Sequence, residues 1–196
     1  LALGTSLVAV KAQGQFDNVA IKPTHVAGNV YMLEGSGGNI GLSVGEDGLL
    51  MIDTQFAPLA EKIQAAMREI DRQLEYVLNT HHHGDHTGGN GFFGKQATVV
   101  AHENVRGRLL GGSSDKEALP TITFNEQLSL HFNGEDVQVM HIGPGHTDGD
   151  SIIYFKTSNV LHMGDQFFNG RFPFIDLGSG GTVTGYAKNI EAVLAM

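Results

Sequence analysis

The segment from residue 49 to residue 78 constrains the fold most strongly, because it predicts a strand, a helix and a second strand in succession. Residues 49–52 and residues 76–78 are short apolar runs. A strand–helix–strand unit crosses over in the right-handed sense, which makes its two strands parallel neighbours. The apolar residues between the runs are spaced three or four apart, as on one face of a helix, and are Leu59, Ile63, Met67 and Ile70.

Apolar runs on both sides of this unit predict further strands. Residues 26–33 and 39–44 are expected to pair as a hairpin across the glycine-rich turn at residues 34–38. Residues 97–101 predict another strand, and residues 102–110 predict a helix after it.

The second half of the chain has a different pattern. Short β-rich runs separated by turn sequences predict an antiparallel meander, and these runs are residues 127–132, 137–142, 151–155 and 160–163. A final helix is expected with Tyr186, Ile190, Val193 and Leu194 on one face. We therefore expect an α/β protein in which two sheets pack together and helices lie outside them.

Composition limits the partners and the kinds of site that this chain can have. Its 196 residues suffice for one domain, and a net charge of −9 with neutral histidines disfavours binding to nucleic acid. No segment predicts a membrane span. Without cysteine, a transition metal must be bound by histidine and carboxylate groups. A small-molecule substrate is the expected partner, and the sequence leaves the oligomeric state open.

The first residues predict the remnant of an export signal. Residues 1–10 are mostly apolar and uncharged, and Val10-Lys11-Ala12 resembles a signal-peptidase site. We therefore expect residues 1–12 to be the end of a signal, residues 13–196 to form the domain, and the protein to be periplasmic or secreted. The alternative is an ordinary N-terminal strand or disordered tail in a cytoplasmic protein.

A histidine-rich loop directly after the second predicted strand, at residues 80–86, indicates a metal site. Alternate side chains of an extended stretch share a face, so His81 and His83 can bind one ion together. Asp85 and His86 follow a glycine and can turn toward a second ion. The alternative is a histidine-rich surface tract that binds metal only incidentally. The position between a strand and a glycine-rich turn argues against an engineered tag.

These residues, His81-His82-His83-Gly84-Asp85-His86, resemble the His-x-His-x-Asp-His signature of the metallo-β-lactamase superfamily. Two further segments resemble that family in the same order: Gly143-Pro144-Gly145-His146-Thr147 and Gly164-Asp165. The resemblance covers residues 26–195 and implies a four-layer αββα sandwich. It also implies that His146 joins the first metal ion and that Asp165 bridges two ions. The implied metal ligands are His81, His83, Asp85, His86, His146 and Asp165.

A site made of histidine and carboxylate groups suits Zn²⁺, and we expect two zinc ions per chain, although Fe or Mn would also fit. Such a pair lowers the pKa of a shared water, so that a hydroxide can attack a carbonyl group. Asp85 is expected to be both a ligand and the catalytic carboxylate, because the resemblance implies that it delivers a proton to the leaving group. Asp53 and Thr80 are expected to hold a ligand histidine in the correct tautomer. The alternative for Asp53 is a simple strand-end cap.

The sequence departs from the family pattern after Asp165. Members generally have one more histidine ligand on a later strand, and no histidine follows Asp165 here. The apolar last residues, 193–196, lack a helix cap. We therefore expect the sequence to be an incomplete part of a longer domain that supplies this ligand. The alternative is a second ion held by Asp85, His86, Asp165 and water.

The expected reaction is attack of a metal-bound hydroxide on a carbonyl group. A β-lactam is the leading expected substrate, with a lactone or a thioester of the hydroxyacylglutathione-hydrolase type as alternatives, and an iron-binding redox protein as a further one. The missing cysteine excludes the lactamases that use a thiolate ligand. Asn169 and Arg171 lie in a segment with four phenylalanines and are expected at the rim of the substrate site. Packing of those phenylalanines in the core is the alternative.

Overall fold

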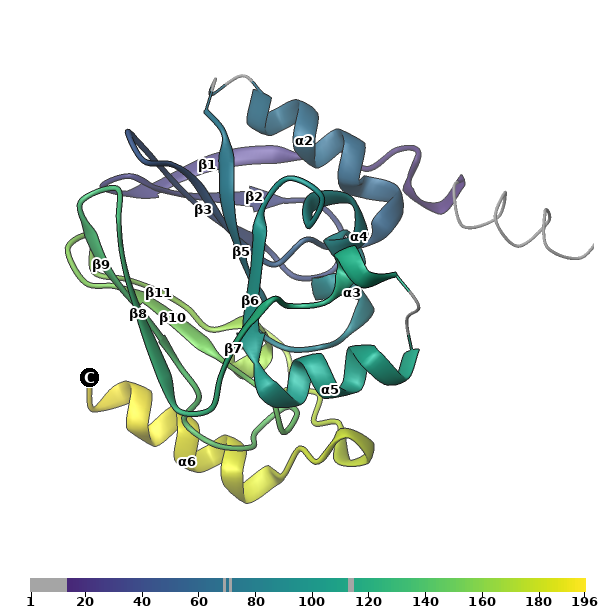
Figure 1. Cartoon of the computed structure of the whole chain (residues 1–196). Coiled ribbons are helices and arrows are strands. Elements are labelled where there is room, and N and C mark those ends of the chain that lie inside the picture. The colour runs from purple at the N-terminus through teal and green to yellow at the C-terminus, as the bar shows by residue number, and fades with distance from the viewer. Residues whose placement is uncertain (1–13, 69, 71, 113–114) are drawn as a thin grey trace, which may run out of the picture.

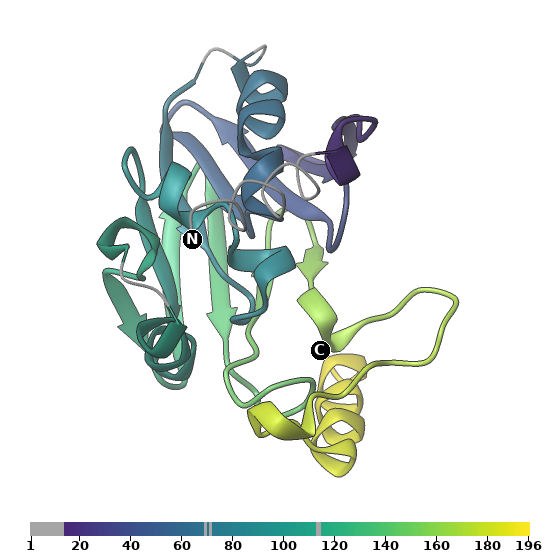
Figure 2. The ribbon, with the colours of Figure 1, turned by 90° about the vertical axis from the view of Figure 1, so that its right-hand side faces the viewer.

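The computed structural model describes residues 14–68, 70, 72–112 and 115–196, which form two β-sheets with helices outside them (Figures 1 and 2). The predicted signal remnant at residues 1–12 lies outside the described residues. The first sheet contains β1 (Lys22–Ala27), β2 (Val30–Glu34), β3 (Ile40–Gly45), β4 (Gly48–Ile52), β5 (Leu74–Leu78), β6 (Thr98–His102) and β7 (Ile122–Phe124), side by side in chain order. The second contains β11 (Val160–His162), β10 (Ile152–Phe155), β9 (Glu135–Met140) and β8 (Gln127–Phe132), in that order.

Helices complete a four-layer αββα arrangement, as expected (Figure 2). Helix α2 packs outside the first sheet, and α6 lies on the far side of the molecule, with the second sheet (Figure 1). No helix in the described part of the chain combines the length and the apolar character that a membrane crossing needs. The helices are α2 (Ala60–Arg68), α3 (Gly84–Thr87), α4 (Asn90–Phe93), α5 (Glu103–Gly112) and α6 (Val183–Leu194), with short 3₁₀ turns η1 (Ala57–Leu59), η2 (Lys116–Ala118), η3 (Gly164–Gln166) and η4 (Leu177–Ser179).

The predicted strand–helix–strand unit is confirmed as β4, α2 and β5. Strands β4 and β5 are parallel neighbours. Side chains alternate along β4, so Leu49 and Met51 pack toward α2 while Leu50 and Ile52 fill the core between the two sheets. Because parallel strands end at the same edge of a sheet, the loops that follow β4 and β5 are brought together there.

The antiparallel meander of the second sheet is confirmed as β8 to β11. The prediction of one strand over residues 26–33 is wrong, because a turn at Gly28, whose φ is +53°, separates β1 from β2. The last helix is confirmed, but Leu194 is 82% exposed and does not share the packed face. Asn189 is buried there instead and donates to the backbone oxygen of Gly143.

Candidate metal centre

Three histidine nitrogens converge beyond the carboxyl end of β5. Nε2 of His81 is 3.1 Å from Nδ1 of His83 and 3.2 Å from Nε2 of His146. Nδ1 of His83 is 2.9 Å from Nε2 of His146. The first two histidines follow β5, and His146 belongs to the loop between β9 and β10. The structure therefore brings together the three residues expected at the first ion.

The other ring nitrogen of each histidine contacts an oxygen acceptor. These pairs are His81 Nδ1 with Thr80 Oγ1 (3.1 Å), His83 Nε2 with Asp176 Oδ2 (2.9 Å) and His146 Nδ1 with the backbone oxygen of Phe174 (2.7 Å). Because these acceptors hold the ring protons, the three converging nitrogens direct lone pairs at one another. A cation between them satisfies all three, and tetrahedral zinc separates its nitrogen ligands by roughly 3.3 Å. The geometry therefore fits a metal ion.

A second cluster lies beside the first and is centred on His86. Its Nε2 atom is buried and has no hydrogen-bond partner. Oδ1 of Asp165 lies 3.2 Å from that atom, without hydrogen-bond geometry, and Oδ2 of Asp85 lies 3.7 Å away. The other carboxylate oxygen of Asp165 is 3.6 Å from Nε2 of His146. The two oxygens of Asp165 thus face the two clusters, as a bridging ligand requires.

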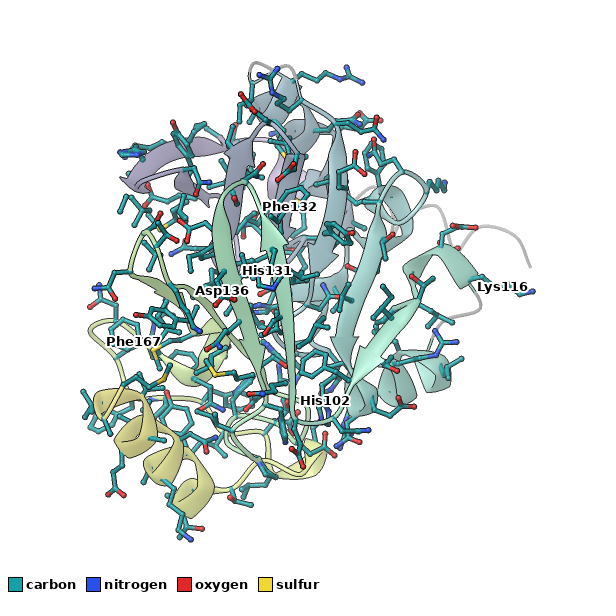
Figure 3. The ribbon with its side chains drawn as sticks, turned by 60° about the vertical axis from the view of Figure 1, so that its left-hand side comes forward. His102, Lys116, His131, Phe132, Asp136 and Phe167 are labelled. Atoms are coloured by element: carbon teal, nitrogen blue, oxygen red, sulfur yellow. The ribbon has the colours of Figure 1, made fainter. Side chains whose placement is uncertain are left out.

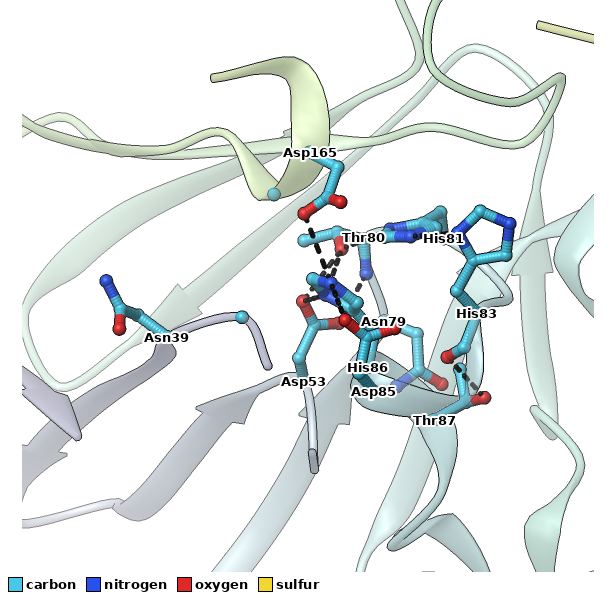
Figure 4. Close-up of polar contacts among 12 residues, drawn as sticks. Asn39, Asp53, Asn79, Thr80, His81, His83, Asp85, His86, Thr87 and Asp165 are labelled. Atoms are coloured by element: carbon cyan, nitrogen blue, oxygen red, sulfur yellow. Dashed lines mark hydrogen bonds and ion pairs between the residues drawn. The ribbon is translucent and has the colours of Figure 1, made fainter. Parts of the chain in front are cut away.

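Asp53 orients the second cluster from below (Figure 4). Its Oδ2 atom is 2.7 Å from Nδ1 of His86 and also accepts from Thr80 Oγ1 at 2.7 Å, while Oδ1 accepts from the Thr80 backbone N–H at 2.8 Å. The ring proton on Nδ1 leaves Nε2 available for a metal. Asp53 has a φ of +64°, a strained conformation for a residue other than glycine. The expected support of a ligand histidine by Asp53 and Thr80 therefore agrees with the geometry.

Protonation in the metal-free site follows from these contacts. Burial acts to lower the pKa of His86, but the charges of Asp53 and Asp165 outweigh it and raise the pKa to about 10. Burial, followed by the neighbouring histidines, lowers the pKa of His81 well below its ordinary value. Burial acts to raise the pKa of Asp165, yet contact with His86 brings it below its ordinary value. A metal ion at His86 would therefore displace a proton.

The glycine-rich turn between β2 and β3 lies against Asp85 and His86. A Cβ atom added at Gly37 would stand 2.7 Å from the Asp85 Cβ, and one added at Gly38 would stand 2.4 Å from Cε1 of His86. Gly37 also has a φ of +87°. Only glycine allows the turn to approach this closely. Asp85 itself is 34% exposed, so its carboxylate can be reached from solvent.

In the described part of the chain, no hydrogen bond or ion pair joins the predicted rim residues to either cluster. Asn169 and Arg171 are exposed, in the segment between η3 and η4. Three phenylalanines of this segment are also exposed: Phe167 by 62%, Phe172 by 97% and Phe174 by 61%. Figure 3 shows Phe167 near α6. Packing of these three side chains in the core, the alternative interpretation, is therefore wrong.

Two histidines near the site lie outside both clusters. Nε2 of His162 contacts the backbone oxygen of Asn39, and its Nδ1 accepts from the Gly164 N–H, so both ring nitrogens are used. These contacts leave neither ring nitrogen of His162 free to bind a metal ion. Nε2 of His82 faces Ser179 Oγ at 3.3 Å.

Sequence reasoning missed Asp176. This carboxylate lies 93 residues from His83, and contact with Ser179 and with His83 holds its pKa below the ordinary value. The general need of a ligand histidine for a partner at its second nitrogen predicts such a carboxylate, but no spacing in the sequence identifies which one.

Comparison with known proteins identifies the family to which the chain belongs. The family model of the metallo-β-lactamase superfamily matches residues 26–195. The chain belongs to the metallo-β-lactamase superfamily. Membership in this superfamily supports a metal-dependent hydrolase, and its fold implies binding of a divalent metal, for which the two histidine clusters provide candidate ligands.

Curated relatives resemble the chain over part of their length. It is 32% identical over 139 residues to the hydroxyacylglutathione hydrolase of Rhodospirillum rubrum, covering 70% of the chain and 51% of that protein. It is 29% identical over 131 residues to the 2,4-dinitroanisole O-demethylase subunit alpha of Nocardioides sp., covering 64% and 40%. The chain thus spans about half or less of the length of these relatives.

Solved structures of the superfamily share the fold. The DIM-1 metallo-β-lactamase superimposes with a TM-score of 0.77 at 16% sequence identity, covering 91% of this chain and 85% of that one. At this level of identity the likeness shows the fold alone.

Proposed function

We propose that this chain hydrolyses a thioester and that it uses two zinc ions bound at the His81 and His86 clusters. The observation that carries the proposal is the position of Asp165, whose two carboxylate oxygens face one cluster each. Histidine and carboxylate ligands at these spacings suit zinc. The relatives named hydroxyacylglutathione hydrolase favour a thioester over a β-lactam as the substrate.

Each residue has a separate task in the proposed reaction. When bound, the two ions would lower the pKa of a shared water and polarise the substrate carbonyl. His81, His83 and His146 would hold one ion, and Asp85, His86 and Asp165 the other. Water oxygen bonds to the carbonyl carbon, the carbon–sulfur bond breaks, and a proton goes to the leaving sulfur. Asp85, whose side chain is 34% exposed, would pass that proton.

The segment between η3 and η4 would contact the acyl part of the substrate. It begins two residues after Asp165, and the backbone oxygen of Phe174 within it accepts from Nδ1 of His146. The exposed phenylalanines provide apolar contact area, while Asn169 and Arg171 provide polar groups at the rim.

Hydrolysis of a β-lactam is the second candidate, because lactamase structures share this fold over most of the chain. One panel separates the candidates. Metal content would be measured by elemental analysis, and a chromogenic thioester, a lactone and a β-lactam would be assayed before and after chelation. We expect about two zinc ions per chain and a chelator-sensitive activity that is highest on the thioester.

Two alanine variants serve as test and control. His81→Ala should lose both metal and activity, whereas His131→Ala, an exposed residue on β8 (Figure 3), should keep both. Faster turnover of the β-lactam would replace the proposed substrate class. A wild-type chain that binds no divalent metal would contradict the proposal as a whole.

A further inference from the structure

A buried carboxylate outside both clusters joins the two loops that carry His146 and Asp165. Asp150 lies in the same loop as His146, between β9 and β10, and only 5% of its surface is exposed. Its carboxylate accepts from the backbone N–H of Thr147, at 3.0 and 2.9 Å, and from the Thr147 hydroxyl. Thr147 directly follows His146, so these bonds hold the backbone of the turn that contains His146.

The same carboxylate binds the neighbour of the other ligand. Nε2 of Gln166, the residue directly after Asp165, donates to Oδ2 of Asp150. Gly145 leaves space for this contact, because a Cβ atom there would stand 2.2 Å from Nε2 of Gln166. A single buried carboxylate therefore binds the residues that follow two candidate ligands, one before β10 and one after β11.

We propose that Asp150 is a positioning residue that, through Gln166, sets the place of Asp165 relative to His146 and so determines binding of the second metal ion. The inference rests on the proposed two-metal site. Nδ1 of His146 has a further hydrogen bond to the Phe174 backbone oxygen, whereas the ion pairs of the Asp165 side chain in the described part of the chain are with the candidate ligands His86 and His146. Loss of the Asp150 link should therefore affect the second ion more than the first.

Two substitutions remove the link in different ways. Asp150→Asn can put an N–H₂ group, which cannot accept from Nε2 of Gln166, in place of Oδ2, and it removes the charge that strengthens the bonds from Thr147 and Gln166. Gln166→Met removes the link from the other side, with a side chain of similar volume, and leaves the Thr147 bonds intact. It also removes Oε1 of Gln166, which is buried without a partner, so this variant should fold.

Glu135 provides a matched control. It is a buried carboxylate that also accepts from a turn, from the backbone N–H of Thr157 at 2.9 Å and from the N–H and hydroxyl of Ser158. It begins β9, where it pairs with Phe132 of β8, at the opposite end of β9 from the His146 loop. Glu135→Gln should therefore lower the melting temperature without changing metal binding.

The measurement is a zinc titration of each folded, metal-free full chain against a chromophoric chelator, which gives two stepwise dissociation constants. We expect the second constant to rise about 10- to 100-fold in Asp150→Asn and about tenfold in Gln166→Met. The first constant should change far less, and both should be unchanged in Glu135→Gln. Rescue of the second site by excess zinc should restore the wild-type stoichiometry in both variants.

Two results would overturn the inference while leaving the proposed function intact: wild-type values of the second constant in both variants, or an equal rise in Glu135→Gln. The first would show that Asp165 is placed without Asp150, and the second that general loss of stability explains the effect. A wild-type chain without any zinc binding would instead remove the proposed function on which the inference rests.

Discussion

Position 38 requires glycine because there is no room for a side chain, and not because the backbone has a positive φ. Replacing it with alanine puts a methyl group 2.4 Å from the His86 ring, and that ring is held from the other side by Asp53. We expect Gly38→Ala to cost about 1–3 kcal/mol of stability, in the range of overpacked sites, and to weaken metal binding. Urea unfolding and metal titration would measure both effects.

Gly84 is the control for that substitution. It begins α3 between His83 and Asp85, and a Cβ atom added there meets nothing within 4 Å. Gly84→Ala should therefore leave stability nearly unchanged. Equal losses in the two variants would show that the loop rejects any added methyl group, and that the contact with the His86 ring is not the cause.

Asp53 tests how much a charged acceptor contributes to a ligand histidine. In Asp53→Asn the side chain keeps its shape but loses its negative charge, so the pKa of His86 should fall from about 10 and Nε2 should become a weaker ligand. We expect metal affinity to drop about 10- to 100-fold. Histidine NMR titration of the metal-free chain would follow the pKa, and an unchanged His86 pKa would contradict this account.

At the scale of elements, the ends of β6 and β9 meet through a stacked histidine pair. His102 and His141 have ring centroids 4.1 Å apart, Nε2 of His102 donates to the Asn125 oxygen, and its Nδ1 accepts from the Asn104 N–H. Burial, followed by the charge of His141, lowers the pKa of His102. The folded chain therefore favours the neutral ring.

This contact predicts a pH dependence. Since the folded pKa of His102 is below the unfolded value of about 6.5, its contribution to stability is fully present above that value and is lost as the pH falls through the folded pKa. Metal-free wild type should lose stability between about pH 7.5 and 5.5 more steeply than His102→Gln. Parallel curves in urea unfolding would contradict this.

The elements that the sequence predicted have strong periodic patterns. Strand β4 and helix α2 each bury a regular set of apolar side chains, and the meander strands are separated by turn sequences. Strand β1 has an exposed pattern and contains Pro23, and β7 has only three residues, so neither carries a periodic signal. Tertiary pairing with their neighbours defines these two strands.

The residues of the candidate site also differ in how far the sequence predicted them. His81, His83 and His86 are close in sequence, so their spacing predicted them directly, whereas His146 and Asp165 required the family resemblance. Asp150 and Asp176 have no motif, because their roles depend on contacts with Gln166 and His83 that exist only in the folded chain. Contacts of this kind depend on how the two sheets pack together, and no local sequence pattern predicts that packing.

At the scale of the whole molecule, the candidate ligands come from both sheets. His81, His83 and His86 follow β5 of the first sheet, and His146 and Asp165 follow β9 and β11 of the second. Bound ions would therefore connect the two halves of the fold. Each site saturated at about 100 times its dissociation constant adds about 2.7 kcal/mol.

Chelation should consequently lower the melting temperature. For a chain of this size we expect a fall of roughly 5–10 °C per site emptied, seen by calorimetry with and without chelator. In His146→Ala, which lacks one of the two candidate ligands from the second sheet, the shift should be much smaller. A melting temperature that does not depend on chelator in wild type would show that the halves are held together without metal.

The separation of the candidate ligands along the chain also means that they are synthesised at different times. The loop after β5 leaves the ribosome first, and His146 follows His81 by 65 residues. A nascent chain therefore offers His81, His83, Asp85 and His86 to metal before the second sheet has been made. The candidate centres can be complete only after His146 and Asp165 have been synthesised and the two sheets have packed together.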